Sequence, residues 1–336
     1  MDTVHRALPA MPGFADVWML VRQRPAVLRR STRELAEALA DIYGSRFAVW
    51  HTDELLFGVQ GGRLALRTLA GVDLPAPEVV CVRQVAGPMD NDREVTLLRH
   101  LECMGSTLIN TVDAQLTSRN KIWQLQELAL AGLPVPDTIS YATAPLEGVV
   151  RSPRLGTPCV VKSVSGANGG QVFLAPDPHL LREVAGSLSQ ETPFLFQEHV
   201  AHSHGRTLRV VVVDGEPTGA VLHASRNGTL TANIATGGSA TLCTGRYPQA
   251  EELAVCAARA LDLDIAGGGP VVHFGERLHG LRGECRPWLA AGAARDHPCN
   301  RGLHRPSSVC PRLRGIAANL RAKATSHKVE VQAEGP

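Results

Sequence analysis

The feature that most constrains the fold of this 336-residue chain is a lysine at the end of one predicted strand, ahead of a glycine-rich loop and a second predicted strand. Lys162 ends the first strand, and Gly166, Gly169 and Gly170 lie in the connection. A lysine there can reach phosphate oxygens as a point charge, while glycines let backbone N–H groups close over the same phosphates. A glycine-containing hairpin with a surface lysine fits equally well. No Gly-Lys-Ser/Thr sequence of the Walker A type occurs.

A second feature follows about thirty residues later, where the apolar strand Phe194-Leu195-Phe196 runs into polar residues. Such a strand can present backbone groups to an adenine edge while its aliphatic side chains pack against the ring. A simple edge strand leading into a loop is the alternative. Histidines 199, 202 and 204 follow. Their spacing fits neither a strand face nor a helix face, which favours solvated loop histidines over a metal site.

The third feature is an arginine at the start of a continuous β-branched run. Arg209 precedes Val210 to Val213, whose central residues should be buried in a sheet, and Asp214-Gly215 predicts a hairpin turn after them. An arginine anchored there can present a planar fork to a phosphoryl group or a carboxylate. A strand-edge arginine in a surface ion pair is the alternative.

Strand and helix patterns alternate through the first hundred residues, and this alternation predicts a small domain with a largely parallel sheet. Strands are expected at 17–21, 47–50, 63–69 and 78–82, with helices at 31–40 and 91–104. A further helix is expected from Ser118, as its cap, to about residue 131. The predicted domains are an N-terminal α/β domain (1–112), a subdomain with the glycine-rich loop (113–192), a C-terminal subdomain (193–300) and a disordered tail (301–336).

Composition excludes some classes of protein. The formal net charge is only +2, from 34 basic and 32 acidic side chains, so there is no electrostatic case for a nucleic-acid partner. The eight cysteines include no Cys-x-x-Cys pair, and we expect reduced thiols. The apolar run Val17–Val21 is too short for a signal peptide, and no run approaches the ~20 residues that span a bilayer. We therefore expect a cytoplasmic protein without a membrane partner.

Together these features resemble the RimK-like ATP-grasp ligases, and most closely the animal branch that makes N-acetylaspartylglutamate and β-citrylglutamate. The resemblance extends over roughly residues 15–300 and is dense between 90 and 262. It also involves the segments Asn91 to Glu102, Asn120 to Ala129 and Gly132 to Tyr141. It implies an α/β fold of the ATP-grasp type, with a small parallel N-terminal domain followed by two ATP-grasp subdomains.

The resemblance also implies a reaction: ATP phosphorylates a substrate carboxylate, and the amine of glutamate then displaces phosphate. The acid would be a small one such as N-acetylaspartate or citrate. Arg209 would steady the transferring phosphoryl group. The positions that match the family's ATP-binding residues are Lys121, Lys162, Gly166, Gly169, Gly170, Gln197, Glu198, His199, Val200, Gly205, Arg206 and Asn233.

Departures from the family pattern cluster where magnesium is expected. Glu284 matches the bridging glutamate, but Gly269 stands in place of an aspartate and Arg286 in place of an asparagine. Thr207 and His223 stand where an aspartate and an arginine are common. Magnesium prefers oxygen ligands in octahedral geometry, so a glycine removes a ligand and an arginine adds repulsion. The alternative to a ligase is therefore an impaired pseudoenzyme that binds nucleotide weakly or acts as a partner subunit.

Overall fold

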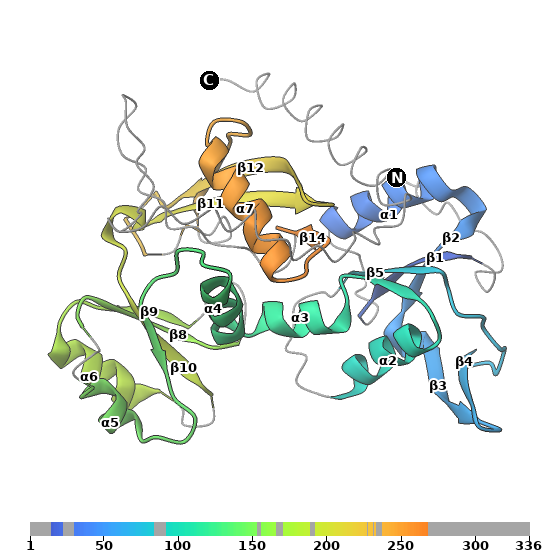
Figure 1. The fold of residues 1–336 in the computed structure, drawn as a ribbon, viewed down its shortest axis with the longest axis horizontal. Helices are drawn as coiled ribbons and strands as arrows, with labels where there is room; N and C mark the ends of the chain where they lie inside the picture. The colour runs from blue at the N-terminus through green and yellow to red at the C-terminus, as the bar shows by residue number, and fades with distance from the viewer. Residues whose placement is uncertain are drawn as a thin grey trace, which may run out of the picture. The chain divides into compact units, whose positions relative to one another are not determined.

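The computed structural model describes residues 15–22, 30–83, 92–152, 156–165, 171–188, 192–226, 228–230, 232 and 237–267. These residues divide into two compact units, 15–115 and 116–267, with α3 (Val112–Arg119) at the division. Figure 1 shows both units as ribbons. Gly166, Gly169, Gly170, Asn233, Gly269, Glu284 and Arg286 lie outside the described residues, as does the predicted tail.

The first unit is built on a four-stranded sheet with the order β2-β1-β5-β6, in which all neighbouring strands are parallel. Its strands are β1 (Val17–Val21), β2 (Phe47–His51), β5 (Val79–Arg83) and β6 (Thr107–Ile109). All five residues of β1 are buried, as expected for a central strand of a parallel sheet. The prediction of a parallel α/β domain is therefore confirmed.

Two helices pack against this sheet: α1 (Arg30–Tyr43) contacts β2, and α2 (Asp92–Cys103) contacts β6. The short helices η2 (Gly44–Arg46) and η3 (Thr52–Glu54) flank β2. An antiparallel hairpin of β3 (Leu55–Gln60) and β4 (Arg63–Thr68) forms a separate two-stranded sheet. The sequence analysis predicts β4 but misses β3.

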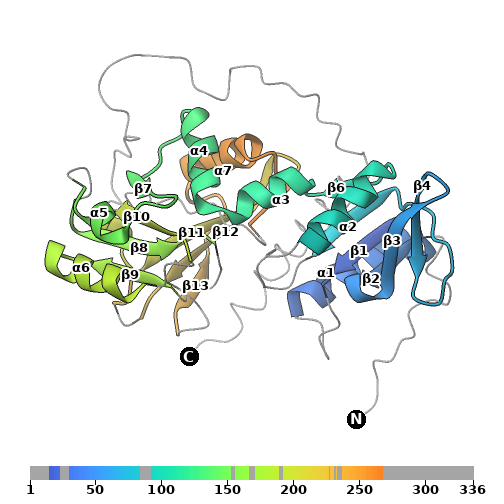
Figure 2. The same ribbon diagram turned by 90° about the horizontal axis from the view of Figure 1, so that it is seen from below.

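The second unit begins with α4 (Lys121–Leu130), followed by an antiparallel sheet of order β7-β10-β8-β9. The strands are β7 (Thr138–Ser140), β8 (Cys159–Ser163), β9 (Val172–Ala175) and β10 (Phe194–Glu198). The helices α5 (Leu146–Val150) and α6 (Pro178–Ser187) lie beside this sheet (Figure 2). They contribute Val149 and Leu181 to a core with Val161 and Phe196. Strand residues alternate between faces, so Lys162 and Gln197 project from the face opposite this core.

A second sheet of this unit has the order β13-β12-β11-β14. It contains β11 (Arg206–Val213), β12 (Glu216–Ala224), β13 (Ser239–Leu242) and β14 (Ile265–Ala266), and η4 (Ala201–Ser203) precedes it. The helix α7 (Pro248–Ala260) packs on β11 and β12, as Figure 1 shows. The predicted turn is present: Asp214 and Gly215, with φ of 52° and 71°, join the two strands.

One predicted helix is wrong at its start. Residues 112–131 form two helices instead of one that begins at Ser118, because the chain breaks at Asn120. The Asn120 side chain accepts hydrogen bonds from the backbone N–H groups of Ile122 and Trp123, and so caps α4. Lys121 is thereby the first residue of α4, whereas the predicted helix would make it the third residue after the cap.

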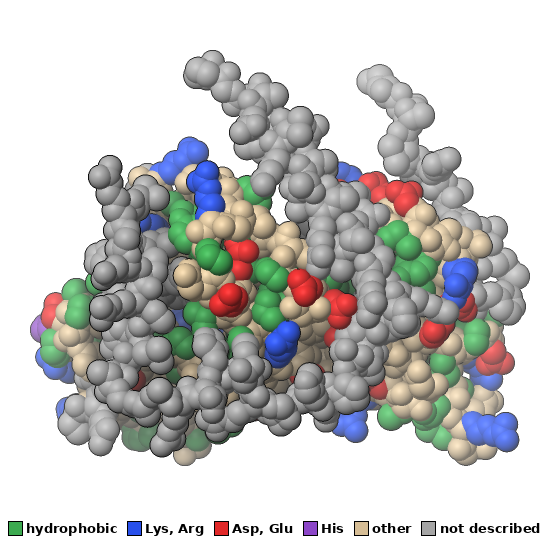
Figure 3. All heavy atoms as spheres, turned by 45° about the horizontal axis from the view of Figure 1, so that its top comes forward, with side chains coloured by type: hydrophobic (Ala, Val, Ile, Leu, Met, Phe, Trp, Pro, Cys, Tyr) green, Lys and Arg blue, Asp and Glu red, His purple; other side chains and the backbone are tan. Residues whose placement is uncertain are grey.

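The described cysteines only partly follow the expectation of reduced thiols. Cys81, Cys103, Cys159 and Cys243 are free, whereas Cys256 is disulfide-bonded. Among the described residues, no helix is long and apolar enough to cross a bilayer. On the face drawn in Figure 3, basic and acidic side chains are interspersed.

Candidate nucleotide site

Two lysines that are 41 positions apart in sequence come together at the end of β8. The backbone N–H of Lys121 donates to the carbonyl of Val164 at 3.0 Å, which ties the start of α4 to the end of β8. The Lys121 ammonium donates to the carbonyl of Ser163 at 2.9 Å. Lys162 is the neighbouring residue on β8, and its charge and that of Lys121 interact. A concentrated positive charge therefore lies at this end of the sheet.

Burial disfavours the charged form of both side chains. It lowers the pKa of Lys121. Burial, with the nearby Lys121 charge, lowers the pKa of Lys162 from 10.5 to about 8. At pH 7 both lysines are still cations, and each gains from an anion that enters beside them. Two half-buried cations held close together are chemically suited to a polyanion such as a nucleotide phosphate chain.

The strand that was predicted to contact adenine, β10, also provides a hydrogen-bond acceptor for the Lys162 ammonium. The Lys162 ammonium donates to Gln197 Oε1 at 2.8 Å, and Gln197 Nε2 donates to Thr138 Oγ1 at 2.8 Å. Gln197 is only 9% exposed. Its side chain thus has a specific lysine contact in addition to any backbone role. The sequence reading misses Thr138, which lies in a three-residue strand with little pattern of its own.

Two N–H groups of the predicted adenine-binding stretch already have partners. The Glu198 N–H donates to the carbonyl of Asp137 at 2.9 Å, and the His199 N–H donates to the carbonyl of Pro158 at 3.2 Å. These bonds attach the end of β10 to its neighbours. Contacts of Glu198, His199 and Val200 with a nucleotide stay a prediction, and they would have to use other groups.

The loop after β10 is held by a pair of histidines. His199 Nε2 lies 3.1 Å from His204 Nδ1, and His204 Nε2 lies 3.1 Å from the Gly228 carbonyl. The carbonyl can only accept, so His204 Nε2 carries a proton; when His204 is neutral, its Nδ1 accepts the hydrogen bond from His199. Burial, with the His204 charge, lowers the pKa of His199. Within the described ranges, no group of three or more His, Cys, Asp or Glu side chains could hold a metal ion.

Gly205 and Arg206, also expected near the nucleotide, lie where this loop enters β11. Gly205 has φ of +66°, and a Cβ there would lie 2.9 Å from the carbonyl oxygen of Thr229. Only glycine fits such a close approach of two backbones. The structure thus gives Gly205 a conformational role that is independent of any ligand. Arg206 is exposed at the start of β11.

Arg209 lies in the middle of β11, opposite Val221 on β12. Leu208, Val210 and Val212 are buried on the alternate face, and α7 packs against this strand pair. Arg209, Thr207 and His223 share the other face. Burial lowers the pKa of the Arg209 guanidinium, which nevertheless stays charged at any physiological pH. The convergence of Arg209 with the two lysines stays a prediction.

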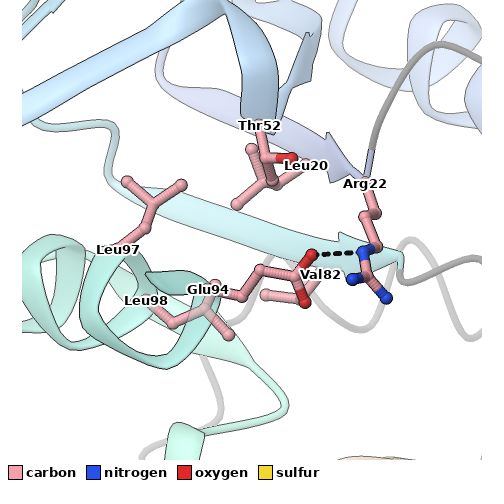
Figure 4. Close-up of a pocket in the computed structure, with 7 residues that line it drawn as sticks. All are labelled: Leu20, Arg22, Thr52, Val82, Glu94, Leu97 and Leu98. Atoms are coloured by element: carbon pink, nitrogen blue, oxygen red, sulfur yellow. Dashed lines mark ion pairs between the residues drawn. The ribbon is translucent and has the colours of Figure 1, made fainter. Parts of the chain in front are cut away.

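The first unit has a small pocket that the sequence analysis does not predict. It is lined by Leu20, Arg22, Thr52, Val82, Glu94, Leu97 and Leu98 (Figure 4). Arg22 Nε and Glu94 Oε1 form an ion pair at 2.6 Å across it. The pocket lies at the carboxyl ends of β1 and β5, where ligands of parallel sheets commonly bind. No sequence motif marks this pocket; its position at the carboxyl ends of parallel strands is the signal that could have indicated it.

Comparisons with known proteins agree with the geometry of the second unit. Residues 118–272 match the RimK-like ATP-grasp domain family. The chain is 38% identical over 217 residues to beta-citrylglutamate synthase B of Danio rerio, covering 64% of this chain and 53% of that protein. It is 36% identical over 224 residues to N-acetylaspartylglutamate synthase A of Homo sapiens, covering 66% of this chain and 57% of that protein. The chain thus spans little more than half the length of these relatives.

The fold has a counterpart among solved structures. The ATP-grasp ligase PsnB, complexed with a phosphomimetic variant of minimal precursor, Mg and ADP, aligns with a TM-score of 0.53 and 19% identity. The alignment covers 77% of this chain and 89% of PsnB. At this identity the likeness shows a shared fold. Together with the family match, it leads to one conclusion: residues 118–272 are a RimK-like ATP-grasp domain.

Proposed function

We propose that this chain is an ATP-dependent carboxylate–amine ligase that joins glutamate to a small acid, N-acetylaspartate or citrate. The observation that carries the proposal is the pair of half-buried lysines, Lys121 and Lys162, at the end of β8. The names of the relatives indicate glutamate ligation. The proposal places the activity in the cytoplasm and involves no nucleic-acid or membrane partner.

The reaction has two displacement steps, and both depend on charge neutralisation and positioning. In the first, a carboxylate oxygen of the acid attacks the γ-phosphorus of ATP, the bond to the β-phosphate oxygen breaks, and ADP leaves. In the second, the amine nitrogen of glutamate attacks the acyl carbon, the bond to the phosphate oxygen breaks, and phosphate leaves with the proton that the amine gives up. Lys121 and Lys162 hold the phosphate chain, and Arg209 stabilises the phosphoryl group in transfer.

The family also implies magnesium at the phosphates. In the part of the chain that the structure describes, no cluster of metal ligands offers a site for it. The expected ligand Glu284 lies outside the described residues, and Gly269 and Arg286 stand in place of two others. The described residues therefore do not make a magnesium site, so no step is assigned to the ion. This mismatch favours the second candidate function, a pseudoenzyme that binds nucleotide weakly or acts as a partner subunit.

Thermal unfolding in the presence of ATP separates the two functions. A ligase should be stabilised by ATP, and magnesium should increase the effect. Stabilisation that magnesium leaves unchanged, without turnover, would support the pseudoenzyme. ADP release that requires both glutamate and an acid would establish the ligase, and N-acetylaspartate and citrate should be compared as acids.

Lys162→Ala tests whether the site is correctly placed. This variant should lose the ATP-induced stabilisation because it removes a phosphate contact. Arg182→Ala is the matched control, since Arg182 is an exposed cation on α6. An equal ATP effect in wild type and Lys162→Ala would remove Lys162 from the nucleotide site. No ATP effect in the wild type would refute the ligase and a nucleotide-binding pseudoenzyme, and would leave only the partner-subunit role.

A further inference from the structure

A row of hydrogen bonds crosses three strands on the face of the sheet that carries Lys162. Lys162 Nζ donates to Gln197 Oε1 at 2.8 Å, and Gln197 Nε2 donates to Thr138 Oγ1 at 2.8 Å. The Thr138 hydroxyl in turn donates to the carbonyl of Pro136 at 2.9 Å. The strand register explains the alignment, because Gln197 is directly opposite Thr138 on β7 and opposite Val160, two residues from Lys162, on β8.

Donor and acceptor chemistry fixes the direction of this row from both ends. A threonine hydroxyl has one proton, and here the Pro136 carbonyl accepts it. The Thr138 oxygen can therefore only accept from its other neighbour, so the amide nitrogen of Gln197 must face Thr138. Lysine has only donors, so the amide oxygen of Gln197 must face Lys162. Both requirements select the same orientation of the Gln197 amide.

Lys162 needs such an acceptor. Its burial and the neighbouring Lys121 charge both oppose a positive charge at this position. A hydrogen bond accepted from the ammonium favours the charged form, and so offsets part of that cost. Gln197 is itself 9% exposed, so bulk water has little access to replace its partners. The orientation of one amide therefore affects both the charge and the direction of Lys162.

We propose that Thr138, acting through Gln197, is a positioning residue that keeps the Lys162 ammonium charged and directed towards the phosphates of a bound nucleotide. The nucleotide part of this inference rests on the proposed function. Without the Thr138 hydroxyl, the amide nitrogen of Gln197 would be buried without its acceptor. An unsatisfied buried donor is costly, so the amide would rotate away from its present position and Lys162 would lose its acceptor.

The experiment compares Thr138→Val, which replaces the hydroxyl by a methyl group, with Thr138→Ser, which keeps the hydroxyl. Calorimetry measures ATP affinity, and amine labelling at a series of pH values, read by mass spectrometry, measures the titration of Lys162. Thr138→Val should weaken ATP binding about tenfold, the effect of one hydrogen bond to a charged group. It should also lower the pKa of Lys162. Thr138→Ser should stay within about twofold of wild type in affinity.

Gln197→Leu is a second variant, for use if Thr138→Val fails to fold. It removes the middle member of the row of hydrogen bonds. It should show the same two changes. The inference is overturned if ATP affinity and Lys162 titration are the same in wild type and in the folded variants. It is also overturned if Thr138→Ser loses as much as Thr138→Val, since packing would then explain the loss.

The labelling measurement keeps this inference separate from the proposed function. If the wild-type protein does not bind ATP, the proposed function fails, but the titration of Lys162 can still be followed. A lower Lys162 pKa in Thr138→Val, but not in Thr138→Ser, would then support the positioning role. An unchanged Lys162 pKa in both variants would overturn it.

Discussion

His223 on β12 and Arg209 on β11 lie on the same face of one strand pair, because Arg209 is opposite Val221 and His223 is the next residue on that face. His223 is only 6% exposed. Burial and the Arg209 charge lower the pKa of His223, and a hydrogen bond with the backbone of Ala232 acts in the opposite direction. With its pKa lowered below 6.5, the imidazole beside Arg209 is mostly neutral at pH 7.

This relationship predicts acid sensitivity. The pKa of His223 in the folded protein lies below its value of 6.5 in the unfolded chain, so the unfolded state binds more protons as the pH falls below about 6.5. Stability that is present above pH 6.5 should therefore be lost towards lower pH. His223→Gln should reduce the loss of melting temperature between pH 7.5 and 5.5.

The control for this measurement is Gln126→Ala, because Gln126 is an exposed side chain on α4 that does not ionise. It should keep the wild-type pH dependence. Equal pH dependence in wild type and His223→Gln would contradict the assignment of acid sensitivity to His223. Differential scanning fluorimetry without nucleotide is sufficient, so the test does not depend on activity.

Lys162 gives a prediction at the alkaline end. Its pKa is about 8 in the folded protein and 10.5 in the unfolded chain, so the unfolded state holds the extra proton between these values. The contribution of Lys162 to stability should therefore rise with pH through that window, by about 1.5 kcal/mol from pH 8 to 9.5. Denaturant unfolding of wild type and Lys162→Met at both pH values measures it. The prediction is contradicted if the unfolding free energies of the two proteins change equally between the two pH values.

The sequence predicts the parts of this fold that have strong periodic or apolar patterns. The buried run Val17–Val21 is found as β1, and the β-branched run after Arg209 is found as β11. The short strands β7 and β14 are missed, since three residues or fewer carry no measurable period. The helix expected from Ser118 is interrupted because Asn120 is a better cap than the pattern indicated.

The candidate site shows the same contrast between residues that a local pattern indicates and contacts that only the folded chain provides. Lys162 is indicated by its place before a glycine-rich loop, and Lys121 only by a family resemblance. Their proximity depends on the hydrogen bond between the Lys121 N–H and the Val164 carbonyl, a tertiary contact that no local pattern contains. The partnership of Gln197 with Thr138 depends on the pairing of two strands that are about sixty residues apart. The sequence alone does not give the register between two such distant strands; it is known only from the folded sheet.

Asp264 is an acidic residue directly before β14. Its backbone carbonyl accepts a hydrogen bond from the Asp214 N–H at 2.8 Å, at the turn end of β11. Four residues of strand, about 13 Å, separate Val213 at that end from Arg209. Asp264 is thus poorly placed to serve a phosphate held by Arg209.

Burial, with the charges of Asp262 and Asp214, raises the pKa of Asp264. A raised carboxyl pKa means that stability present at low pH is lost as the pH rises through the folded value. Asp264→Asn should therefore raise the melting temperature at pH 7.5 by about 2 °C. The gain should vanish near pH 3.5. A lower melting temperature at pH 7.5 would show that the charged form is stabilising instead.

Gly267, directly after β14, allows the sharpest steric prediction. Its φ is +104°, and a Cβ there would lie 2.8 Å from both the Val210 oxygen and the Val211 Cα. Both are backbone atoms that cannot move without disturbing β11, so Gly267→Ala should cost about 2 to 4 kcal/mol of unfolding free energy. Gly186→Ala is the matched control: it lies on exposed α6 with no atom near the added carbon, and should gain up to about 1 kcal/mol. Denaturant unfolding of both variants measures the contrast. If Gly267→Ala is as stable as wild type, the close approach of this segment to β11 is wrong.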